Sequence, residues 1–154
     1  MSYFRGDPDW DKNLYRHPDR QGLNPEERYT MQHDIYSLGV CLLEIGLWNS
    51  FVRYPEARGG NTAYPNTELI GLSVSALQKK TPKAIKQLLV DLARRELPGR
   101  MGEIYEEVVV NCLTCLDPDN MDFGDAIEAD DADGTGIGVR YIEKILSKLN
   151  SITM

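Results

Sequence analysis

The segment from Asp34 to Trp48, DIYSLGVCLLEIGLW, constrains the fold of this chain more than any other part of it. After Asp34, only Ser37 and Glu44 carry polar side chains there. The segment is long enough for a helix, and its apolar residues fall on nearly every side, whereas a surface helix keeps one polar face. We therefore expect a helix that is surrounded by the rest of a protein core.

The remaining pattern predicts further helices and no strand. Thr81-Pro82 pairs a capping residue with proline at the first helical position. Residues 54–66 are rich in Gly, Pro and Asn and predict a loop, as do residues 1–30, apart from a short helical turn from Pro25. The expected fold class is all-α, with helices over 34–48, 67–80, 81 to the LPGR sequence at 97–100, 101–116 and 139–152.

Length and charge narrow the function classes. A chain of 154 residues is of one-domain size. A net charge of -7 disfavours nucleic-acid binding. The longest apolar run is too short and too interrupted to span a bilayer, and the polar N-terminus predicts no signal peptide. We expect an intracellular, cytoplasmic protein with no nucleic-acid or membrane partner.

Three landmarks in order resemble a known family. DIYSLGVCLLE is similar to D-x-[YWF]-S-x-G-[VIC]-x-L-x-E, the central helix of the large lobe of eukaryotic protein kinases, with Asp34, Gly39 and Glu44 at its marked positions. Upstream, YRHPD at Tyr15–Asp19 resembles the Y-x-A-P-E that closes a kinase activation segment. Downstream, VVVNCLTCLDPD resembles the kinase stretch in which Cys-Leu precedes Asp-Pro, here Asp117-Pro118. The flanking sequences look most like kinase-like proteins of filamentous fungi.

The resemblance implies a protein-kinase C-lobe-like helical domain packed around a central hydrophobic helix. It divides residues 1–154, as one truncated lobe, into an APE-like segment and loop (1–33), a helical core (34–116), an acidic loop (117–138) and a C-terminal helix (139–152). The structural landmarks it implies are Tyr15, Pro18, Asp19, Asp34, Gly39, Glu44, Asp117 and Pro118.

The resemblance does not bring kinase chemistry with it. Phosphoryl transfer needs a glycine-rich loop, a lysine, an H-R-D aspartate and a metal-binding D-F-G, all before the APE-like element. None precedes Tyr15 in these residues. We expect no catalytic residue, no metal and no cofactor in this chain, with ATP and Mg²⁺ relevant only to a complete parent kinase.

Several kinase-like residues take other expected roles. MDFGDA at 121–126 contains D-F-G after the APE-like element, so we expect Phe123 to pack on the core rather than a metal site. Asp34 is expected to cap its helix. Asp19 stands where kinases have a glutamate that pairs with a buried arginine near the D-P turn, and that arginine is missing here.

Two metal hypotheses are weaker alternatives. Cys112 and Cys115 have a spacing that serves zinc, but they lie in an apolar helical pattern, and His17 and His33 are only distant further ligands. Core packing is favoured for both cysteines. DADGTG from Asp131 resembles a calcium loop, but its closing carboxylate, Glu143, is one position late.

Two functional hypotheses remain. The first is a catalytically incomplete, pseudokinase-type lobe that acts as a protein-interaction module, with a protein partner or a second copy covering the central helix. A fold-back of the N-terminal loop, with Trp10, Leu14 and Tyr15, would be another cover. The alternative is a fragment of an ATP-dependent protein kinase whose small lobe and catalytic loop lie upstream or in another chain.

Overall fold

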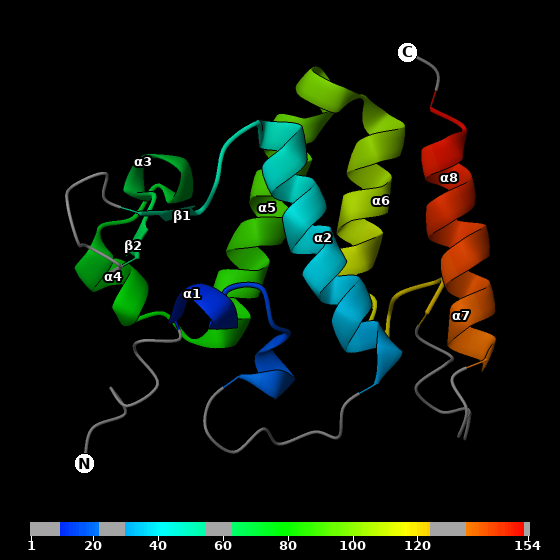
Figure 1. Ribbon diagram of the computed structural model, residues 1–154, viewed down its shortest axis with the longest axis horizontal. Helices are drawn as coiled ribbons and strands as arrows, with labels where there is room; N and C mark the ends of the chain where they lie inside the picture. Colours follow the sequence, from blue (N-terminus) through cyan, green and yellow to red (C-terminus); the bar gives the residue numbers. More distant parts are fainter. Residues whose placement is uncertain (1–9, 22–29, 55–62, 124–134, 153–154) are drawn as a thin grey trace.

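The computed structural model describes residues 10–21, 30–54, 63–123 and 135–152, and these are mostly helical with one two-stranded sheet (Figure 1). The all-α expectation is therefore confirmed in its coarse form. In chain order the elements are α1 (Trp10–Asn13), η2 (Pro18–Arg20), α2 (Met31–Leu47), β1 (Val52–Arg53), β2 (Tyr64–Pro65), α3 (Thr67–Ile70), α4 (Val74–Gln78), α5 (Pro82–Met101), α6 (Glu103–Leu113), α7 (Thr135–Tyr141), η4 (Ile142–Leu146) and α8 (Ser147–Asn150).

Helix α2 packs against α5 and α6, which form an antiparallel pair beside it, and the C-terminal helix lies against the outer side of α6 (Figure 1). Two glycines of α2 allow this helix to approach α5 and α6 closely. A Cβ on Gly39 would lie 2.7 Å from Cys112 Cβ, and one on Gly46 would lie 2.5 Å from a Leu97 methyl. The Tyr105 hydroxyl donates to the Leu42 carbonyl at 2.6 Å. The three helices thus form the centre of the core.

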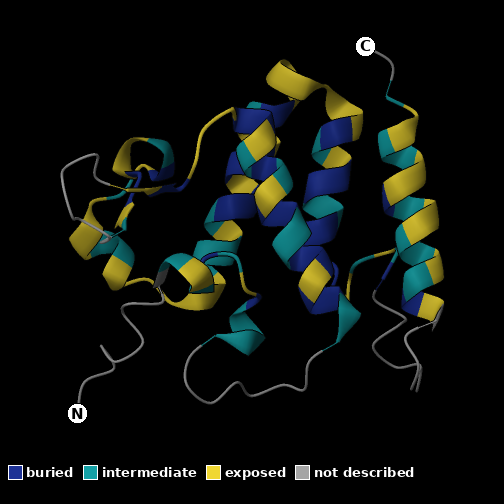
Figure 2. Cartoon of the chain, viewed as in Figure 1, coloured by how far each residue is buried: buried dark blue, intermediate teal, exposed yellow. Residues whose placement is uncertain are grey.

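The expectation that α2 is covered on every side is wrong for the described residues. Asp34, Cys41, Ile45 and the C-cap residue Trp48 are exposed, and their spacing places them on one helical face. Figure 2 shows exposed stretches on α2 beside buried ones. The other residues of α2 are buried or half-buried, with α5 and α6 as its main neighbours. We call Asp34, Cys41, Ile45 and Trp48 the outward stripe.

The helical hairpin α5–α6 follows its sequence signals, but its inner boundary and its C-terminal end are shifted. Thr81 Oγ1 accepts the Ala84 N–H at 3.2 Å, and Pro82 begins the helix, as expected. The expected break at LPGR does not occur, because α5 continues through Pro98 to Met101. The chain turns instead at Gly102, whose φ of 88° is a conformation that glycine adopts without strain. Helix α6 ends at Leu113, three residues before the expected Leu116.

The segment between α2 and α5 differs from expectation in two ways. The helix expected over 67–80 is divided into α3 and α4, because Gly71 ends α3 with φ 76° and the Ser73 hydroxyl starts α4 by accepting the Ala76 N–H. Two short strands, which the sequence did not predict, pair antiparallel with Val52 opposite Pro65. Asn66 holds this region together, since its side-chain amide donates to the Ser50 carbonyl at 2.9 Å.

The C-terminal helix begins four residues before the expected Val139 and changes its winding midway. Its central part, Ile142–Leu146, is a π-helix. The sequence places Ile142, Ile145 and Leu146 on one apolar face of this helix, but only Ile145 is fully buried, while Ile142 and Leu146 are 57% and 37% exposed. The wider π turn shifts which residues face the core.

Candidate functional site

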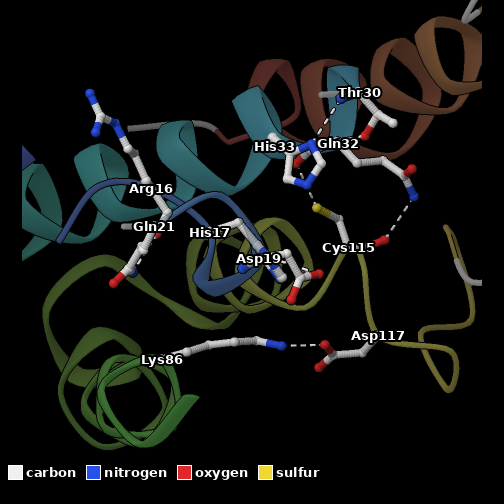
Figure 3. A network of polar contacts seen from close by, with 10 residues as sticks. All are labelled: Arg16, His17, Asp19, Gln21, Thr30, Gln32, His33, Lys86, Cys115 and Asp117. Atoms are coloured by element: carbon white, nitrogen blue, oxygen red, sulfur yellow. Dashed lines mark hydrogen bonds and ion pairs between the residues drawn. The ribbon is translucent and has the colours of Figure 1, made fainter. Parts of the chain in front are cut away.

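The structure brings the APE-like segment to the start of α2 and near the turn that follows α6 (Figure 3). Pro18 and Asp19 lie in η2, which also contacts α5. His17 caps η2, because its Nδ1 accepts the Asp19 N–H at 3.1 Å. The candidate site is the cluster that forms there, which consists of His17, Asp19 and His33, with the Lys86–Asp117 ion pair beside it.

His17 and His33 face each other across this cluster. Their ring centroids are 5.6 Å apart and edge to face, and His17 makes a similar contact with the fully buried Tyr36. The Asp19 carboxylate lies 3.4 Å from His17 Nδ1. One ligand atom each from His17, Asp19 and His33 lies within 4.8 Å of the others. The sequence named these histidines only as distant further ligands for the two cysteines, and it did not predict that they lie beside each other.

Both histidine rings are held in place by backbone groups. The Thr30 N–H donates to His33 Nδ1 at 2.8 Å, and the Thr30 hydroxyl lies 3.2 Å from the same nitrogen. Both side chains are about 5% exposed. Burial disfavours the charged imidazolium, so it lowers the pKa of His17 to about 4 and also lowers that of His33. Both rings are therefore neutral at physiological pH.

Two interactions join the turn after α6 to the rest of the cluster. The Lys86 ammonium of α5 forms an ion pair with Asp117. Cys115 and Gln32 exchange hydrogen bonds, since the Gln32 amide donates to the Cys115 carbonyl at 3.1 Å and the Cys115 thiol donates to the Gln32 carbonyl at 3.1 Å (Figure 3). The Asp-Pro turn is thereby fixed to α2 and α5.

The other landmark residues have structural positions. Gly39 contacts Cys112 in the core. Glu44 accepts the Phe51 N–H at 3.0 Å, and burial together with a hydrogen bond to Glu44 raises the pKa of the half-buried Tyr15. Pro118 lies exposed in the turn after α6.

Asp34 is not the helix cap that the sequence predicted. Helix α2 begins one turn earlier, at Met31, with Thr30 as its N-cap. The Thr30–His33 hydrogen bond supplies the capping interaction in its place. Asp34 remains in the first helical turn, where a carboxylate interacts favourably with the helix dipole.

The expected core packing of the two cysteines and of Phe123 is confirmed. Cys112, Cys115 and Phe123 are each fully buried in the core. Cys112 packs on Gly39, and Cys115 bonds to Gln32. The candidate calcium residues from Asp131 lie in the range 124–134, outside the described residues.

A shallow depression of about 290 Å³ lies between α6 and the C-terminal helix. Its lining mixes both charges, with Arg94 and Lys148 opposite Glu106 and Glu107. Lys148 lies 3.4 Å from Glu107 across it. No candidate nucleophile with an adjacent base lines it within the described residues.

No family model, curated protein or solved structure matched this chain in three comparisons. Within the described ranges, no helix combines the length and apolarity needed to cross a membrane.

Proposed function

We propose that this chain is a pseudokinase-type large lobe that acts as a protein-interaction module and carries no phosphotransfer chemistry of its own. The observation that supports this most directly is the outward stripe of α2. In kinase-like lobes the corresponding helix is packed by upstream helices and catalytic-loop residues. Here Trp48 is 91% exposed and Ile45 55% exposed, so an apolar face is left for another protein surface to cover.

The N-terminal segment covers a different part of α2. Leu14 is 6% exposed and belongs to the core, and Tyr15 packs beside Glu44. The fold-back of this segment therefore accounts for part of the cover, yet it leaves Cys41, Ile45 and Trp48 exposed. The covering surface is a protein partner or a second copy of the chain.

Light scattering over a dilution series tests this proposal. We expect concentration-dependent association, or a monomer that binds a hydrophobic dye and captures a partner through α2. Ile45→Asp and Trp48→Ser should reduce association and dye binding, because each places a polar group in the stripe. Val74→Ser is the matched control, since Val74 is 44% exposed on α4, away from the stripe. A stable monomer that binds no dye contradicts the proposal.

The alternative function is a fragment of an ATP-dependent protein kinase. The order of the landmarks, from Tyr15 through Asp34 to Asp117, is what favours it. The reading frame before Met1 separates the two functions, because H-R-D and D-F-G sequences there would favour the enzyme. The isolated chain should show no thermal shift with ATP and Mg²⁺ in either case.

A further inference from the structure

We propose that His17, Asp19 and His33 form a binding site for one Zn²⁺ ion, which joins the APE-like segment to the start of α2. This role goes beyond the proposed interaction function and does not depend on it. Two imidazoles and one carboxylate are a ligand set that zinc accepts, with water completing a tetrahedral site.

The distances are close to those of an occupied site. Zinc bonds of about 2.0–2.1 Å place two ligand atoms roughly 3.4 Å apart around a tetrahedral ion. His17 Nδ1 and Asp19 Oδ2 are already 3.4 Å apart. The third ligand atom, from His33, lies within 4.8 Å of the others, so a side-chain shift of roughly 1.4 Å or less closes the site.

The hydrogen bonds show which nitrogen of each histidine ring carries the lone pair that a metal needs. His17 Nδ1 accepts the Asp19 N–H, so this nitrogen carries a lone pair that can bind the metal instead. His33 Nδ1 accepts the Thr30 N–H in the same way, so it carries the lone pair and Nε2 carries the ring proton. Zinc bound to His33 therefore displaces either the Thr30 N–H from Nδ1 or the proton from Nε2.

The nearby carboxylates favour a cation here. The charged groups that act on the two rings are the carboxylates of Asp19, Asp34 and Asp117 and the cations of Lys86 and Arg20. Negative charges outnumber positive ones around the cluster, and a divalent ion offsets this excess.

Titration of the full chain with Zn²⁺ alone, followed by calorimetry and by metal analysis after dialysis, tests the site. We expect one ion bound per chain and a higher melting temperature, reversed by a chelator. Co²⁺ used as a spectroscopic probe should give the visible absorption of a tetrahedral nitrogen- and oxygen-bound ion. A strong near-ultraviolet thiolate band would assign the metal to the cysteines and overturn this ligand set.

Variants locate the ion. His17→Gln should abolish binding, and Asp19→Asn should weaken it by roughly 10-fold or more, because a neutral amide is a weaker zinc ligand than a carboxylate. Asp119→Asn is the matched control, because it removes an exposed carboxylate near Asp117 and should leave binding unchanged. If His17→Gln does not fold, Asp19→Asn decides the question. Absence of binding at micromolar Zn²⁺, or equal binding by Asp19→Asn and the wild type, overturns the proposal.

Discussion

Glycines at the contact between α2 and α6 set how closely these helices pack. A Cβ at Gly39 would lie 2.7 Å from Cys112 Cβ and 3.2 Å from the Leu113 backbone nitrogen, neither of which is the end of a flexible side chain. Gly39→Ala should therefore destabilise the chain by about 1–3 kcal/mol in urea unfolding, as overpacked cores do. Gly99→Ala is the control, since Gly99 lies in α5 with no atom within 4 Å of a built Cβ. That change should stabilise by about 0.5–1 kcal/mol. Equal effects of the two changes would contradict the close packing.

The three cysteines should differ in reactivity. Cys41 lies on the outward stripe, whereas Cys112 and Cys115 are buried. Burial raises the pKa of Cys112 to about 12 and also raises that of Cys115. Burial and the nearby Glu44 carboxylate raise the pKa of Cys41 as well, so its thiolate fraction is small at neutral pH and grows as the pH rises.

A thiol-reactive reagent tests this order. In the native chain Cys41 alone should react, more slowly than a free thiol and faster at higher pH, while urea should release the other two. Native Cys41→Ser should show almost no labelling. Rapid native labelling of Cys112 or Cys115 would contradict their place in the core.

At the scale of elements, the sequence predicted those helices whose position depends on neighbouring residues in the chain. Thr81-Pro82 marked the start of α5, and the dense apolar segment around Ile35–Leu47 marked α2. The errors lie where tertiary packing prevails. Pro98 did not end α5, and the helix continues until Gly102 provides a positive φ. Strands of two residues are too short to leave an alternating pattern.

The all-round apolar character of α2 had two possible meanings, and sequence periodicity cannot separate them. In the sequence, an apolar residue that this chain covers looks the same as one that is left for another protein surface. Leu43 is fully buried, while Ile45, two positions on, is 55% exposed. Only the placement of α5 and α6 decides which residue is covered.

At the scale of the whole molecule, the histidine cluster was beyond sequence reasoning for a related reason. His17 stands before a Pro-Asp turn and His33 stands at the third position of α2, so each has a local capping role. No rule of sequence spacing predicts that two capping residues of different elements lie close together. Their convergence depends on how the N-terminal segment returns to α2, and Leu14, at 6% exposed, is a residue that anchors this return.

Leu14 therefore tests whether the N-terminal segment and the helical core unfold as one domain. Leu14→Ala should destabilise by about 2–5 kcal/mol, because it leaves a cavity in a core shared by both parts. Far-ultraviolet circular dichroism, which follows the helices, should move together with near-ultraviolet signals of the buried Tyr36 and Tyr105. Val74→Ala, at an exposed position of α4, should change little. If the variant loses only a minor early transition while the helices melt as in the wild type, the N-terminal segment folds separately. A zinc ion that bridges this segment to α2 should then merge the two transitions.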